Sequence, residues 1–336
     1  MMSCCWTDRE KRQLVIFALV AFALPYLLGI LMGWGYAAGR DVSVFPSAQM
    51  FYPAAGAMLA ILVTRRDDPT VPRRFFGFFL VLALLMAVCA AGSVVLPAGP
   101  WVTISNAVMI GGSLLCWVFY FWDGKARRTA WHLRLRRTAF GMLALFILLY
   151  FARLLLIGVV TVLADPAQAA AAQDGTAPDS TAWAVMSLNL VLSFFLSFAP
   201  FFGEEFGWRG FLQPLLQKQF GLRGGVAVLG VAWGLWHLPI NLFYYSPDHW
   251  VLSVANQIAV CLCYSIFFGL AYRYTGSIWA PVMIHYFNNN AILLFAEPSA
   301  IQNQALDLPG VVLSTAVTLA IFLPFLAARG YRRARH

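Results

Sequence analysis

Three short polar patterns stand out in this chain because their residue types could together supply a general base and stabilise a developing negative charge. The first is an adjacent pair of carboxylates, Glu204 and Glu205, followed by Arg209. Residues four apart share a helix face, so Glu205 is predicted to pair with Arg209. Glu204 points about 100° away from that pair, and it is therefore the better candidate for a general base. Taken alone, the motif is also typical of a solvated charge pair at a membrane interface.

The other two patterns each contain one histidine. Trp233, His237 and Asn241 are spaced four residues apart, which places them on one helix face at successive turns. His285 and Asn289 have the same spacing. A His/Asn pair can donate two hydrogen bonds to one developing negative charge, as an oxyanion hole requires. The structural alternative is hydrogen bonding between membrane helices, worth about 0.6 kcal/mol per bond.

These polar residues lie in a chain that is otherwise built for a membrane. Of its 336 residues, 61% are hydrophobic and 11% are charged, and the mean hydropathy is +0.74. A soluble domain carries about 25% charged residues, so the composition excludes a water-soluble enzyme and a disordered chain. A spanning helix needs about 20 apolar residues. Runs of this kind occur at 14–36, 44–64, 75–96, 101–122, 139–163, 181–203, 225–245, 251–272, 277–296 and 309–328.

The basic residues provide a test of these spans. Of the 23 lysines and arginines, all but Arg40 and Arg153 fall in alternate connecting segments or at the termini. Such segments face the cytoplasm. The sequence therefore predicts an all-α, polytopic transmembrane helical bundle of about 8–10 spans with both termini cytoplasmic. The net charge of +9 is explained by this orientation and by contact with lipid headgroups, and we expect no nucleic-acid partner.

The same patterns predict the organisation and location of the protein. Residues 1–164 hold N-terminal spans of unassigned role, and 165–180 form an acidic outer loop. Residues 181–300 hold the helical core with the three polar patterns, and 301–336 hold the final span and a basic cytoplasmic tail. Both histidine motifs and the glutamate pair fall in or near the predicted cytoplasmic half. We therefore expect an integral membrane protein with its active site toward the cytoplasm, and the Arg- and Ala-rich composition suggests a bacterial cytoplasmic membrane.

The three patterns, EExxxR, aromatic-xxx-His and HxxxN, together resemble the CPBP family. This is the CAAX-protease and bacteriocin-processing family of intramembrane endopeptidases, also called the Abi family. The order and approximate spacing match over about residues 180–295. One residue departs from the pattern, since Trp233 stands where the family usually has phenylalanine.

The resemblance implies a role for each motif residue. Glu204 and His237 would activate water, His285 and Asn289 would stabilise the tetrahedral intermediate, and Arg209 would orient Glu205. The expected function is an intramembrane endopeptidase that acts on a membrane-associated protein or peptide. One alternative is a non-catalytic membrane scaffold or bacteriocin-immunity protein of the same fold. Another is a transporter with a proton-relay site, because ionisable groups inside membranes also serve that purpose.

The expected chemistry has no metal, although zinc is the alternative cofactor. Two histidines and a glutamate can supply three zinc ligands with water as the fourth, and the set would then be Glu204, His237 and His285. However, the sequence has no HExxH motif, and zinc would compete with the oxyanion role of His285. The six cysteines include no CxxC pair and are expected to be small apolar core residues.

Overall fold

A computed structural model describes residues 6–164, 180–295 and 298–332, and every regular element within these ranges is a helix. This confirms the all-α prediction. Nine helical stretches in the described ranges are long and apolar enough to cross a membrane, which agrees with the predicted number of spans. They are Asp8–Ala37, Val44–Thr64, Arg73–Val95, Trp101–Trp122, Arg137–Ala164, Ser180–Ser197, Ala199–Tyr245, Pro247–Thr275 and Leu308–Ala327.

Two of the predicted spans differ from the helices that form. The predicted span 277–296 contains helix α15 (Trp279–Asn290), whose 12 residues extend only about 18 Å at 1.5 Å per residue. The predicted span 181–203 is divided into α10 (Ser180–Ser197) and α11 (Ala199–Glu205). Pro200 at the start of α11 has no N–H to donate to the preceding turn, so α10 cannot continue through it.

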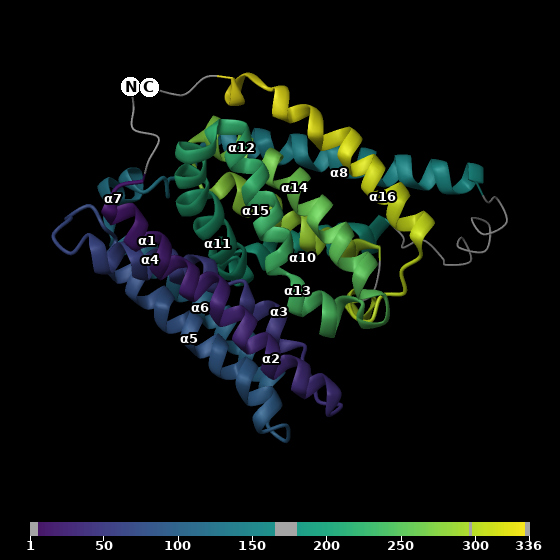
Figure 1. Cartoon of the computed structure of the whole chain (residues 1–336), viewed down its shortest axis with the longest axis horizontal. Helices are drawn as coiled ribbons and strands as arrows, with labels where there is room; N and C mark the ends of the chain where they lie inside the picture. Colours follow the sequence, from purple (N-terminus) through teal and green to yellow (C-terminus); the bar gives the residue numbers. More distant parts are fainter. Residues whose placement is uncertain (1–5, 165–179, 296–297, 333–336) are drawn as a thin grey trace.

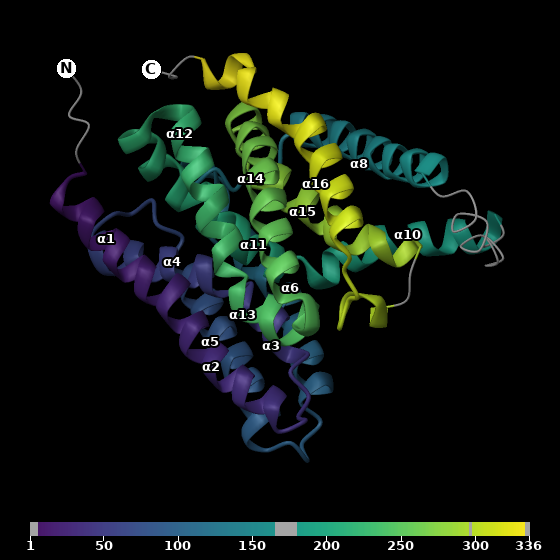
Figure 2. The same cartoon turned by 45° about the vertical axis from the view of Figure 1, so that its right-hand side comes forward.

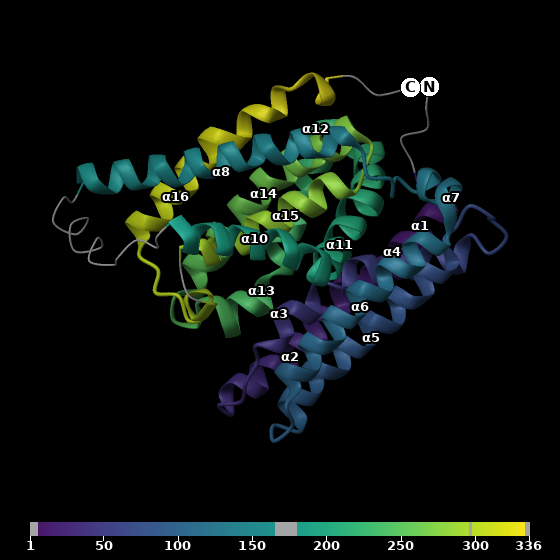
Figure 3. The ribbon, with the colours of Figure 1, turned by 180° about the vertical axis from the view of Figure 1, so that it is seen from behind.

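The helices form three groups (Figure 1). The N-terminal helices α1 (Asp8–Ala18), α2 (Leu24–Ala37), α4 (Tyr52–Thr64), α5 (Arg73–Val95) and α6 (Trp101–Trp122) lie along one flank. The opposite flank is formed by α8 (Arg137–Ala164) and α16 (Leu308–Phe322), as Figure 2 shows. Between the two flanks lie α12 (Gln213–Trp236), α14 (Trp250–Thr275) and α15, an order that is also seen from behind (Figure 3).

The basic connecting segments meet at one end of the bundle. Lys218 Nζ on α12 contacts Glu10 Oε2 on α1 at 2.7 Å, and Arg127 Nε, after α6, donates to the Pro69 carbonyl, after α4, at 3.0 Å. The Ile278 N–H, after α14, donates to the His132 carbonyl, after α6, at 3.0 Å. Arg273 Nε on α14 donates to the Gly330 carbonyl, after α16, at 3.1 Å. The predicted alternation is thus consistent with the fold, while the cytoplasmic orientation of this end stays a prediction.

The N-terminal spans are not a separate body. Phe17 on α1 packs edge-on against Trp208, with ring centroids 5.9 Å apart, and Gln49 Nε2 donates to the carbonyl of Trp236 at 2.8 Å. Buried residues of both halves of the chain form one hydrophobic cluster. The predicted acidic loop that divides the halves lies, except for Ser180, outside the described residues. The N-terminal helices therefore support the helices that carry the polar motifs.

Two glycines allow α4 to approach the glutamate motif closely. A Cβ atom on Gly203 would clash with the carbonyl oxygen of Met50, in the turn that leads into α4, and one on Gly207 would clash with the backbone carbon of Pro53 in the first turn of α4. Both contacts involve backbone atoms that cannot turn aside. A larger residue at either position must push α4 away from the helix that carries Glu204.

Gly207→Ala is therefore expected to destabilise the protein by about 1–3 kcal/mol, the usual cost of overpacking. The matched control is Gly210→Ala, since a Cβ at Gly210 would meet its nearest neighbour at an ordinary 3.4 Å. Thermal unfolding in detergent should show a lower Tm for the first variant and little change for the second. Equal melting temperatures for both variants would contradict the close packing of α4.

Candidate active site

The glutamate motif lies where helix geometry changes. Helix α11 ends at Glu205 and continues as a π-helical segment, η2 (Phe206–Leu212), before α12 begins. Such π segments are frequently found at functional sites. Arg209 Nη1 donates to Glu205 Oε1 at 3.0 Å, and both side chains are completely buried. The pair predicted from the four-residue spacing is therefore present.

Aromatic rings complete the surroundings of Arg209. Its guanidinium carbon lies 4.2 Å from the ring centroid of Trp233 and 5.0 Å from that of Phe268. Arginine stacks well on aromatic faces and is weakly hydrated. These contacts compensate for Nε and Nη2, which have no hydrogen-bond partner among the described residues. Arg209 is thus held in place from three sides.

Glu205 has a second partner that the sequence did not indicate. Its Oε1 atom also accepts a hydrogen bond from Nδ1 of His285 at 2.8 Å. The two residues are 80 positions apart, so no local spacing could signal the contact. Because Nδ1 is engaged, Nε2 is the ring nitrogen of His285 that is left to act on a ligand. Arg209, Glu205 and His285 thus form a chain of contacts that orients the imidazole.

Glu204 has a different environment from its neighbour. Its Oε2 accepts hydrogen bonds from the indole N–H of Trp208 at 3.2 Å and of Trp233 at 2.6 Å. No ion pair involves Glu204 within the described ranges. Neither tryptophan was predicted to donate a hydrogen bond to Glu204. The signal for Trp208 is its position four residues after Glu204, a spacing that places both on the same helix face. The indoles fix one oxygen of Glu204 and leave Oε1 without a partner in the described residues.

His237 stands at a break in its helix. Helix α12 ends at Trp236, and the short α13 (Leu238–Ile240) follows with Pro239 in its first turn. His237 Nδ1 lies 2.7 Å from the carbonyl oxygen of Trp233. A carbonyl can only accept, so Nδ1 carries the proton and Nε2 is free to act as a base. Asn241 Nδ2 donates to the His237 carbonyl at 2.9 Å and steadies this turn.

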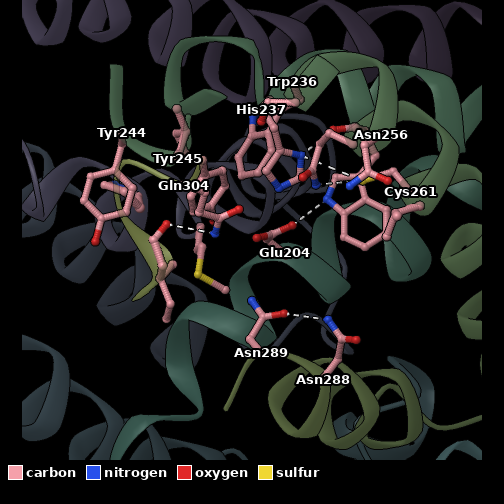
Figure 4. A pocket seen from close by; sticks show the side chains of 18 of the residues that line it. Glu204, Trp236, His237, Tyr244, Tyr245, Asn256, Cys261, Asn288, Asn289 and Gln304 are labelled. Carbon is pink, nitrogen blue, oxygen red and sulfur yellow. Dashed lines mark hydrogen bonds between the residues drawn. The ribbon is translucent and has the colours of Figure 1, made fainter. Parts of the chain in front are cut away.

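The predicted residues converge on one cavity of about 430 Å³ (Figure 4). Glu204, His237, His285 and Asn289 all line it, and Glu204 lies between the His237 and Asn289 side chains in the close-up. Asn289 Oδ1 accepts from Asn288 Nδ2 at 2.9 Å, so the Nδ2 of Asn289 is left as a donor. Glu205 and Arg209 do not line the cavity and lie behind its wall.

A thiol that the sequence assigned to the apolar core also lines this cavity. Cys261 Sγ lies 3.9 Å from His237 Nδ1, a pairing that raises the question of a Cys–His nucleophile. However, the Nδ1 proton is directed to the Trp233 carbonyl, so Nδ1 cannot accept the thiol proton. The sequence could not place Cys261 here because it lies 24 residues from His237 on another helix.

The zinc alternative was tested on the geometry of the side chains. In the part of the chain that the structure describes, no group of three or more His, Cys, Asp or Glu side chains is arranged to hold a metal ion. Hydrogen bonds engage Glu204 Oε2 and the Nδ1 atoms of His237 and His285, so Glu204 Oε1 and the two Nε2 atoms are the atoms of this set that remain for a ligand. Within the described residues, Glu204, His237 and His285 are not drawn together as a metal centre.

The comparisons with known proteins concern the segment that builds this cavity. Residues 186–291 match the family model described as type II CAAX prenyl endopeptidase, Rce1-like. A comparison with curated proteins gives no match, and a comparison with solved structures gives none either. All six predicted site residues lie within the matched segment. The match confirms the resemblance to the CPBP family, and residues 186–291 of this integral membrane protein are similar to the Rce1-like proteases.

Proposed function

We propose that this protein is an intramembrane endopeptidase that hydrolyses a peptide bond of a membrane-associated protein or peptide. The observation that carries the proposal is the convergence of Glu204, His237, His285 and Asn289 on one cavity within the protease-like segment. The bilayer surrounds the bundle as the second partner. The family match does not favour a non-catalytic scaffold or immunity protein.

Glu204 and His237 would prepare the nucleophile. A water molecule between them donates one hydrogen bond to Glu204 Oε1 and the other to His237 Nε2. The first of these protons is transferred to Glu204 as the water oxygen attacks the carbonyl carbon of the substrate. The carbonyl double bond opens, and its electron pair moves to the oxygen. Trp208 and Trp233 hold Glu204 in the orientation that this transfer needs.

His285 and Asn289 would stabilise the resulting oxyanion. Asn289 donates from Nδ2, and a protonated His285 donates from Nε2 with Glu205 as its counter-ion. When the intermediate collapses, the carbon–nitrogen bond breaks and the proton held by Glu204 passes to the leaving amine. The products are a new carboxyl terminus and a new amino terminus.

The proposal is tested by comparing membrane peptides from cells that express the wild type or Glu204→Gln. Mass spectrometry of new peptide termini should find a set of cleavages that only the wild type produces. Purified wild type should then cleave a synthetic peptide that spans one of these sites. Identical termini in the two strains, together with no cleavage by the purified protein, would contradict the proposed function.

Asn289→Ala is expected to lower kcat by about 10²–10³-fold, the usual effect of removing one oxyanion donor, with a small change in KM. The control is Asn290→Ala, because Asn290 Nδ2 donates to the carbonyl of Tyr286 at 2.9 Å and does not line the cavity. Steady-state kinetics on the same peptide separates the two variants. An Asn289→Ala enzyme as active as the control would remove Asn289 from the oxyanion hole.

Treatment with EDTA or 1,10-phenanthroline is expected to leave the cleavage rate unchanged, because the proposed mechanism uses Glu204 and His237 to activate water without a metal ion. The measurement is the rate after dialysis against the chelator, followed by addition of zinc. Loss of activity that zinc restores would show that the metal-free mechanism is wrong.

A further inference from the structure

The cavity is closed toward the basic end of the bundle. From that end, α15 begins beside the segment after α6, where Trp279 Nε1 donates to the Leu133 carbonyl at 2.6 Å. Every residue of α15 from Trp279 to His285 is buried. The floor formed by Glu204 and His285 is backed by further side chains that are essentially inaccessible, namely Phe202, Glu205, Trp208, Arg209 and Phe268. Within the described residues, this layer separates the cavity from the basic end.

The cavity wall extends instead to connecting segments at the opposite end. Ser43 lies directly before α3 (Val44–Gln49), Ser47 lies within α3, and Tyr245 ends the π-helical segment η3 (Asn241–Tyr245). Gln304 also lines the cavity. Its backbone N–H donates to the Tyr245 carbonyl at 2.7 Å, which joins the two segments. We call the part of the cavity lined by Ser43, Ser47, Tyr244, Tyr245, Asn256, Gln257 and Gln304 the vestibule.

The position of the cavity along helix α14 independently indicates that it opens away from the basic end. Its residues that line the cavity are confined to Ser253–Tyr264, in the first part of the helix. The last turn holds Arg273, which contacts the Gly330 carbonyl at the basic end. At 1.5 Å per residue, Asn256 is about 25 Å from Arg273 along the helix axis. The cavity therefore occupies the half of the bundle away from the basic segments.

The vestibule has the chemistry of a peptide backbone site. Asn256 Oδ1 accepts from Thr315 Oγ1 at 3.1 Å, which leaves its amide N–H₂ as a donor. Gln304 Nε2 donates to the Ile301 carbonyl at 3.0 Å, which leaves its Oε1 as an acceptor. Such pairs complement the C=O and N–H groups of an extended chain. Among the described residues that line the cavity there is no lysine, arginine or aspartate, and Glu204 is the only carboxylate.

We propose that the substrate is an uncharged, extended peptide segment that enters through the vestibule, from the membrane face opposite the basic segments. The direction of entry does not depend on the proposed function. That the entering peptide is a substrate rests on it. A charged side chain next to the scissile bond would be buried without a partner, which strongly disfavours its binding. With the basic end in the cytoplasm, the cleaved segment belongs to the outer leaflet or the outer surface, in contrast to the predicted cytoplasmic opening.

Cysteine accessibility in oriented vesicles tests the entry direction. Single cysteines are placed in a background whose six native cysteines are replaced: Asn256→Cys in the vestibule, Asp67→Cys at the basic end and Ala98→Cys at the opposite end. Asp67 and Ala98 are both exposed and serve as the two controls. A membrane-impermeant maleimide should label Asn256→Cys and Ala98→Cys in vesicles of one orientation, and Asp67→Cys only in the other. Labelling of Asn256→Cys together with Asp67→Cys, or from neither face, would overturn the proposal.

A second measurement separates this proposal from the proposed function. In detergent both faces are open, so maleimide-labelled Asn256→Cys should lose cleavage of the synthetic peptide, whereas labelled Ala98→Cys should retain it. A lysine placed beside the scissile bond of the peptide should abolish cleavage by the unlabelled protein. The vestibule would be refuted as the substrate path if the lysine peptide were cleaved efficiently, or if labelled Asn256→Cys still cleaved the original peptide. A protein that cleaves nothing yet labels as expected would refute the peptidase function alone.

Discussion

Glu204→Gln is expected to lower kcat by about 10²–10⁴-fold, the contribution of a general base, while the protein remains folded. Glutamine has nearly the same shape as glutamate, and its amide oxygen can still accept the hydrogen bonds that Trp208 and Trp233 donate to Glu204. What is lost is the ability of Oε1 to take a proton from water. The variant also removes a buried carboxylate that has no ion-pair partner among the described residues, so we expect no fall in Tm.

The matched control is Glu10→Gln, which makes the same chemical change at the basic end. Glu10 accepts from the Thr7 backbone N–H at 2.7 Å in the cap of α1 and pairs with Lys218, and it does not line the cavity. Single-turnover cleavage and thermal unfolding should be measured on both variants. A fully active Glu204→Gln, or one that is inactive only because it unfolds, would contradict the assigned role.

Arg209→Met is expected to destabilise the protein by about 3–5 kcal/mol, the usual cost of removing one partner of a buried ion pair. Glu205 would keep only His285 as a partner in a completely buried site. The double variant Glu205→Gln/Arg209→Met should be more stable than Arg209→Met, since both members of the Glu205–Arg209 pair are then removed together. It should nevertheless have low activity, because His285 loses the carboxylate that orients it.

Arg153→Met provides the control for removing an arginine from inside the bundle. Arg153 donates from Nε to Thr318 at 2.7 Å and from Nη2 to Ser314 at 2.8 Å, with no carboxylate involved. The Thr318 hydroxyl also donates to the Ser314 carbonyl at 2.6 Å, so it stays satisfied when Arg153 is removed. Unfolding in detergent should therefore show a smaller loss of stability for Arg153→Met than for Arg209→Met. An equal or larger loss would contradict the importance of the Glu205–Arg209 pair.

The sequence predicted what depends on composition and on spacing within one helix. Apolar runs predicted an all-helical bundle with nearly the observed spans, and four-residue spacing predicted the Glu205–Arg209 pair. The shared face of His285 and Asn289 is also observed, since both line the cavity. These features follow from helix geometry alone, which is fixed by 3.6 residues per turn.

Features that depend on contacts between distant helices could not be predicted in this way. The hydrogen bond between Glu205 and His285, the indole contact from Trp233 to Glu204 and the nearness of Cys261 to His237 each join two different helices. The length of α15 was overestimated because hydropathy counts apolar residues and does not register where Asn288–Asn290 and the following turn end the helix. Periodicity has a similar limit for the cavity, since it places a residue on a helix face but does not say toward which end of the bundle that face opens.

The central claim is that water activated by Glu204 is the nucleophile, and that the neighbouring Cys261 thiol is not. The most direct measurement is the single-turnover cleavage rate of Cys261→Ser beside that of Glu204→Gln, with one peptide and equal amounts of folded protein. The account predicts that Cys261→Ser cleaves at close to the wild-type rate while Glu204→Gln is slower by at least about 10²-fold. An inactive Cys261→Ser beside an active Glu204→Gln would contradict it.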